Sequence, residues 1–191
     1  NDITPLRLTT SAGDTTFDTT NGSTTINVNH TGHGAVESDF VTFSSAVAVG
    51  GVTADTLNAE HQIIRVIDAD NYEIVVSSAA TSTVSAGGGS STVAKYQINV
   101  GLDTVVGGTG WGAGTYGRAG WGDAEPNGLT TTTQIRLWSH DNFGEDLIIN
   151  PRDSNIYYWD KTGTTSARAV ELSTTTGTKT SVPQVAKQVL V

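Results

Sequence analysis

The residues of this sequence that could do chemistry begin with two histidines. His30 and His33 lie three residues apart, a spacing that would align two metal ligands on one face of a helix. Here they stand in the run HTGHG, which is typical of a turn, and no third ligand follows at a fixed spacing. We therefore expect turn histidines that bond to the backbone rather than a metal site.

A group of carboxylates in the second half could supply calcium ligands or an acid/base pair. Its members are Asp141, Glu145, Asp146, Asp153 and Asp160. They lack the D-x-[DN]-x-[DN]-G order of a calcium loop, and aspartates in turns usually accept hydrogen bonds from backbone N–H groups. A glycan hydrolase would need two carboxylates facing each other at about 5 to 9.5 Å. We expect no catalytic residue, and this hydrolase is the enzyme alternative.

A glycine-rich stretch, GGTGWGAGTYGRAGWG over residues 107–122, carries three aromatic side chains. No Lys-Ser/Thr pair follows a G-x-x-x-x-G, and no strand-loop-helix unit surrounds the stretch, so we expect no nucleotide and no cofactor. Glycine allows positive φ and close approach of the chain. Trp111, Tyr116 and Trp121 are therefore expected to pack on neighbouring molecules or to stack on the sugar rings of a host glycan.

Composition excludes several classes of protein. The 191 residues include 10 Lys+Arg, 19 Asp+Glu and no Cys, with a net charge of -9. Without cysteine there is no disulfide framework, thiolate zinc site or cysteine nucleophile. The negative charge disfavours nonspecific DNA binding. No apolar run approaches the roughly 18 to 20 residues that span a bilayer, and a chain starting without Met and ending in VLV is expected to be part of a longer polypeptide.

Short alternating segments separated by turn residues predict an all-β fold. Two β-branched runs, 61–68 and 72–77, join through an Asp/Asn turn and predict a hairpin. One or two helical turns are expected over 53–60, with Thr53 as the cap. The remaining expected strands of the first half are 3–8, 24–29, 39–44, 80–84 and 92–100.

The second half predicts an antiparallel meander of four strands. The strands are expected over 134–139, 145–150, 155–160 and 168–172, with tight turns between them, the first at 140–144. A four-stranded meander is the unit of a β-propeller blade. One such sheet cannot bury both of its faces alone, which again indicates a part of something larger.

At these residues a resemblance appears. The run RLWSHDNFGEDLIINPR (136–152), continued by IYYWD (156–160), resembles a blade motif in virion structural proteins of tailed bacteriophages. The GWGAG run (110–114), VAKQVLV (185–191) and DITPLR (2–7) fit the same pattern. Those proteins are similar to the nozzle, or tail tubular B, and tail hub components of short-tailed phages. The resemblance implies a propeller-like platform assembled into a ring at the tail end of the virion.

The segment HGAVESDFVTF (33–43) is similar to a small β module inserted in phage tail proteins, although Ser38 stands where a glycine often precedes the aspartate. We accordingly expect a strand and linker of the blade-like sheet over 1–20. A small β-barrel or sandwich module is expected over 21–95, and the glycine-rich loop with the propeller-blade-like meander over 96–191. If the module is an insertion, residues 3–8 and 96–100 should be neighbouring strands.

The resemblance implies a non-enzymatic structural component of the virion, a tail hub or nozzle. It would form a ring with copies of itself and dock other tail proteins, such as an adaptor or fibres. An acidic lumen would let DNA pass without sticking, because like charges repel. The alternatives are a carbohydrate-binding adhesin, which needs Trp111 and Trp121 exposed, and a capsid decoration protein.

Overall fold

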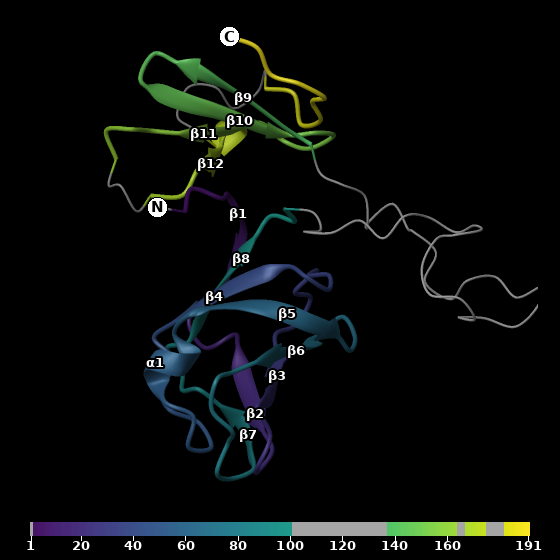
Figure 1. Ribbon diagram of the computed structural model, residues 1–191, viewed down its shortest axis with the longest axis vertical. Helices are drawn as coiled ribbons and strands as arrows, with labels where there is room; N and C mark the ends of the chain where they lie inside the picture. Colours follow the sequence, from purple (N-terminus) through teal and green to yellow (C-terminus); the bar gives the residue numbers. More distant parts are fainter. Residues whose placement is uncertain (1, 101–136, 164–166, 175–181) are drawn as a thin grey trace, which may run out of the picture.

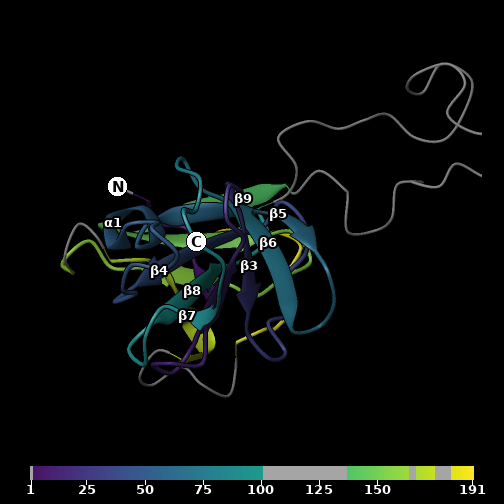
Figure 2. The same cartoon turned by 90° about the horizontal axis from the view of Figure 1, so that it is seen from below.

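The fold is all-β, as the sequence predicts. A computed structural model describes residues 2–100, 137–163, 167–174 and 182–191 (Figure 1). In these residues the strands form two antiparallel sheets, one of eight strands and one of four. Figure 1 shows the larger sheet curling around its own core, with the smaller sheet beyond the β1–β8 end of it. Seen from below in Figure 2, the two sheets overlap along the long axis.

The larger sheet has the order β1-β8-β4-β5-β6-β3-β2-β7, so its neighbours are mostly distant in sequence. In chain order its strands are β1 (Leu6–Thr9), β2 (Thr16–Thr19), β3 (Thr25–Asn29), β4 (Phe40–Ser44), β5 (Glu60–Val66), β6 (Asn71–Val75), β7 (Val84–Gly87) and β8 (Val93–Gln97). Strands β2, β3 and β4 alternate buried and half-buried residues, because one face meets the core and the other meets solvent.

The local predictions in this half are largely confirmed. Strands β5 and β6 form the expected hairpin, with Ile63 opposite Ile74 and Val66 opposite Tyr72. The helical turn is α1 (Ala54–Leu57), which begins after Thr53 because the Thr53 hydroxyl accepts a hydrogen bond from Thr56 N at 3.3 Å.

Two strands of the larger sheet differ from expectation. The sequence predicts a linker after the strand over 3–8, because the stretch up to Gly22 is rich in Thr, Ser, Gly and Asp, yet Thr16–Thr19 forms β2 and its Phe17 and Thr19 are buried against the core. The edge strand expected over 80–84 is displaced to β7, which pairs with β2. Ala80 instead donates a backbone hydrogen bond to Ser23 O, so the chain only becomes a strand beyond it.

The smaller sheet is the four-stranded meander that the sequence predicts, in the order β12-β11-β10-β9. Its strands are β9 (Trp138–Phe143), β10 (Asp146–Pro151), β11 (Tyr157–Trp159) and β12 (Val170–Glu171), followed by a 3-10 turn over Leu172–Thr174. Strand β9 continues through the segment predicted as a turn, while residues 134–136 of the expected strand lie outside the described residues. The reversal therefore comes at Gly144, whose φ of +69° suits glycine.

The segment that begins the chain serves both sheets. Strand β1 pairs with β8, Leu6 opposite Gln97 and Leu8 opposite Tyr96, so segments 3–8 and 96–100 are neighbours as expected. Residues 1–20 were expected in the blade-like sheet, but β1 and β2 belong to the eight-stranded sheet. The chain passes from the smaller sheet to the larger one over residues 3–6. Ile3 O accepts a hydrogen bond from Ala169 N, just before β12, and β1 begins at Leu6.

A second, smaller core lies where the two sheets meet. It is lined by Ile98, Ile149, Tyr157 and Ala169, with Ile3, Leu147 and Trp159 packed against it. Burying this apolar surface holds the smaller sheet against the larger one. The domain boundaries 1–20, 21–95 and 96–191 stay a prediction.

Candidate functional site: the outer face of the smaller sheet

The aromatic residues expected to form an interface or a glycan platform, Trp111, Tyr116 and Trp121, lie outside the described residues. The site is therefore built from the histidines, the carboxylates and the surface of the smaller sheet. Of these, the sequence had singled out the first two.

Both histidines are buried in the turn after β3, where His33 bonds to the backbone as expected and the ring of His30 bonds instead to a tyrosine side chain. His33 Nδ1 accepts a hydrogen bond from Ala35 N at 3.0 Å, so its Nε2 carries the proton, which is donated to Asp68 O at 3.1 Å. The Nδ1 atom of His30 lies 2.8 Å from the hydroxyl of Tyr96. Among the residues that the structure describes, no three His, Asp or Glu side chains are grouped so as to hold a metal ion.

Two tyrosines extend this buried network. The hydroxyl of Tyr96 also lies 3.0 Å from that of Tyr72, and the Arg7 guanidinium sits over the Tyr96 ring at 5.4 Å. Burial raises the pKa of Tyr96 to about 12 and that of Tyr72 well above its ordinary value, while burial and the neighbouring His33 lower the pKa of His30. The cluster is closed to solvent and stabilises the end of the larger sheet.

The carboxylates of the smaller sheet each bind a donor of their own chain. Asp141 accepts from Val191 N and Asn142 N at 2.9 and 2.8 Å, and these bonds lower its pKa. Hydrogen bonds from the Thr162 side chain and backbone likewise lower the pKa of Asp160.

The other carboxylates of this group are also engaged. Asp146 accepts from the Tyr158 hydroxyl, which raises the pKa of Tyr158 to about 12, while Glu145 pairs with Lys161 at 3.1 Å. The Oδ2 atom of Asp153 lies 3.9 Å from Nε of Arg152. A general acid needs a raised carboxyl pKa, and lowered values at Asp141 and Asp160 fit turn-stabilising roles instead.

The register of the smaller sheet separates its two faces. Residues directly opposite each other share a face, so Leu147, Ile149, Tyr157 and Trp159 point together toward the small core. The opposite side, which we call the outer face, consists of Phe143, Ile148, Tyr158 and Val170, together with the polar residues Ser139, Asp141, Asp146 and Asn150.

The outer face mixes apolar and polar side chains, and its apolar residues on the two edge strands are exposed. Phe143 is 59% exposed and Val170 is 50% exposed, although both lie on paired strands. The C-terminal segment 185–191 lies against the β9 side of this face, where Ser139 Oγ donates to Val189 O at 3.1 Å. This C-terminal segment carries three more exposed apolar side chains, those of Val185, Leu190 and Val191. Large exposed apolar side chains on paired strands and on the adjoining C-terminal segment make this face a candidate interface.

Sequence reasoning did not find this surface. A turn was expected over 140–144, which places Phe143 outside any strand and assigns it no face. Residues 139–142 are all polar, so no alternation in the sequence indicates that the strand continues to Phe143.

Comparison with known proteins adds little detail. The sequence matches no protein-family model and no curated protein. Among solved structures the fold is similar to that of the phage phi92 endosialidase, with a TM-score of 0.38 and 15% identity. The match covers 86% of this chain and 23% of the endosialidase chain. This chain therefore spans about a quarter of the length of that protein. Among the described residues, no helix is long and apolar enough to cross a membrane.

Proposed function

We propose that the protein is a non-enzymatic structural component of a bacteriophage virion, a subunit of the tail hub or nozzle. It forms a ring with copies of itself and docks neighbouring tail proteins, such as an adaptor or fibres. The blade motif and its flanking runs support this function by resemblance. The observation that carries it is the open outer face of the smaller sheet.

A four-stranded sheet with two apolar faces is stable only when both are covered. The inner face is covered by Ile98 and Ile3 of the same chain. The outer face presents four apolar side chains among four polar ones, and its two edge residues Phe143 and Val170 meet solvent. We assign its cover to a second copy of the chain, because blades of a propeller stack face to face on like blades.

Mass photometry of the purified chain tests self-assembly, and cryo-EM of the particles gives the ring order. The variant Phe143→Glu/Val170→Lys should keep the circular dichroism spectrum of the folded chain. In mass photometry it should appear only as a monomer. The control Val47→Glu/Ile64→Lys changes two exposed apolar residues away from the smaller sheet, one in the loop after β4 and one on β5, and should still assemble. A chain that stays monomeric at tens of micromolar, or an outer-face variant that assembles normally, would refute the proposed assembly.

Immunogold labelling of phage particles that carry this protein tests its place in the virion. Label at the tail end is expected. Label distributed over the capsid would assign the protein to decoration, and label only at fibre tips would assign it to host recognition.

A further inference from the structure

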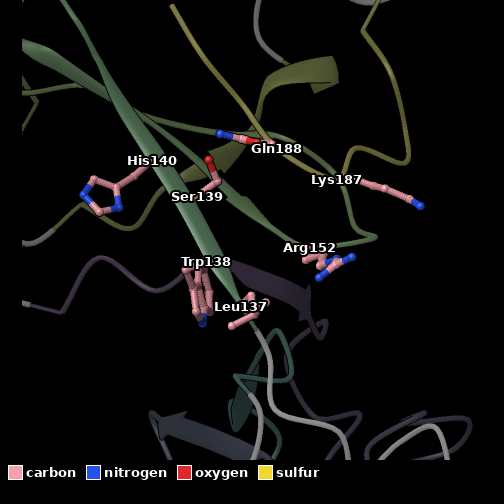
Figure 3. Close-up of a pocket in the computed structure, with 7 residues that line it drawn as sticks. All are labelled: Leu137, Trp138, Ser139, His140, Arg152, Lys187 and Gln188. Atoms are coloured by element: carbon pink, nitrogen blue, oxygen red, sulfur yellow. The ribbon is translucent and has the colours of Figure 1, made fainter.

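A groove at one end of the smaller sheet has a lining unlike the rest of this acidic chain. It lies between the start of β9, the turn after β10 and the C-terminal segment, with a volume of about 540 Å³ (Figure 3). Its seven lining residues are Leu137, Trp138, Ser139, His140, Arg152, Lys187 and Gln188. None of these described residues is a carboxylate, whereas the whole chain has a net charge of -9.

The cationic groups of the groove are gathered on one side. Figure 3 shows the side chains of Arg152 and Lys187 on the same side of β9, with His140 on the other. The carboxylate paired with Arg152 is that of Asp153, at 3.9 Å from Nε and with both side chains more than half exposed. Such a pair contributes little, so the planar guanidinium keeps N–H donors for a ligand.

An aromatic wall and polar donors complete the lining. Trp138 is 38% exposed although it lies on a paired strand, opposite Pro151. An indole that presents part of its ring in a polar groove offers an apolar plane beside hydrogen-bonding groups. The amide of Gln188 lies at the same end, on the segment that Ser139 holds through its hydrogen bonds with Val189.

We propose that this groove binds an acidic oligosaccharide, one whose sugar rings carry carboxylates. Trp138 lies on the His140 side of β9, because residues two apart in a strand share a face. The apolar C–H face of one sugar ring therefore packs on Trp138, and the carboxylate of another ring binds Arg152 and Lys187 across the start of the strand. Hydroxyl groups of the sugar bond to Gln188. The volume matches a few sugar rings. This binding activity goes beyond assembly, and the residues that contact the ligand (Trp138, Arg152, Lys187 and Gln188) are not those changed in the assembly variant, Phe143 and Val170.

Isothermal titration calorimetry with three probes tests the ligand class. Tetragalacturonic acid should bind, its fully methyl-esterified form should bind about tenfold more weakly because the charges are removed, and hexaglutamate should not bind. Equal binding of the ester would overturn the role of the cations. Binding of hexaglutamate as tight as that of the sugar would assign the groove to an acidic peptide, and no binding of the sugar at millimolar concentration would refute the proposal.

Variants of the full chain test the location of the site. Arg152→Gln/Lys187→Gln should weaken binding of tetragalacturonic acid about fivefold or more. Trp138→Ala should weaken it about tenfold, and Trp138→Phe, which keeps a ring, by less. The control Arg65→Gln/Lys161→Gln removes the same charge from exposed cations elsewhere and should bind normally.

Each variant is first checked by circular dichroism and thermal melting. Unchanged binding in both the Trp138 and the cation variants would overturn the proposed site. Because calorimetry reads binding in monomers and rings alike, failure of this proposal is distinguishable from failure of self-assembly.

Discussion

The guanidinium of Arg168 lies 3.4 Å (Nη2 to Oε2) from the carboxylate of Glu60, and this contact joins the two sheets across 108 residues of sequence. Glu60 begins β5 of the larger sheet, and Arg168 precedes β12 of the smaller one. The same guanidinium also binds Asp2 and the carbonyl of Thr4, beside the small core around Ile98. The ionic contacts at this junction therefore add directional restraints between the two sheets beside their shared apolar core.

Replacing Arg168 should loosen the junction without unfolding the larger sheet. Arg168→Met removes three partners at once and should lower the free energy of unfolding of the smaller sheet by about 1 to 3 kcal/mol. Hydrogen exchange should show faster exchange in β9–β12 and unchanged exchange in β3–β6. The control Lys161→Met breaks an ion pair whose side chains are both more than half exposed, and should cost about 0.5 kcal/mol or less. Equal effects of the two variants would contradict a junction role.

The Tyr96 hydroxyl should contribute more to stability than that of Tyr72. It contacts both His30 and Tyr72 in a buried site, whereas the Tyr72 hydroxyl contacts Tyr96. Tyr96→Phe therefore leaves two buried polar groups without a partner and should cost about 2 to 4 kcal/mol, against about 1 to 2 kcal/mol for Tyr72→Phe. Urea denaturation of both variants measures the difference. The reverse ranking would show that the hydroxyl of Tyr96 does not connect this network.

Stability should fall on mild acidification because of His30. Burial, with His33 and Arg7 nearby, lowers its pKa in the folded state, and Asp14 and Asp70 oppose this only in part. The unfolded chain then binds the proton first, so stability is full above about pH 6.5 and is lost as pH falls through that value. Urea denaturation at pH 7.5 and 5.5 measures the loss. His30→Gln should reduce the pH dependence, and an unchanged dependence would assign it to other groups.

Local features of the fold could be predicted from the sequence because their cause is local. Alternation in residues 24–29 and the Asp/Asn turn before Tyr72 act over a few residues, and β3 and the β5–β6 hairpin follow from them. Strand β2 could not be predicted, since Thr16–Thr19 becomes a strand by pairing with β3 and β7. Its burial is a property of the closed sheet.

The candidate site was harder to predict than the fold because each part depends on register or on distant contacts. His30 meets Tyr96 across 66 residues, which no spacing rule indicates. The outer face exists because β9 extends to Phe143, and shifting the turn by a few residues changes which side chains share a face. The groove likewise needs Lys187 beside Arg152, which the C-terminal segment brings there.

Replacing Gly88 should destabilise the protein more than replacing Gly22. The comparison separates the steric cost of an added Cβ from the cost of positive φ, which both glycines share. Both have positive φ, +109° and +82°, so alanine is strained at either position. A Cβ at Gly22 would meet open space, whereas a Cβ at Gly88 would lie 2.7 Å from the ring of Phe17, which packs edge-on against Phe43 in the core. Gly22→Ala should cost about 1 kcal/mol. Gly88→Ala should cost about 1 to 3 kcal/mol more, because the Phe17 ring must move. Thermal and urea denaturation of the pair measure the excess, and equal costs would mean that Phe17 repacks freely around the added methyl group.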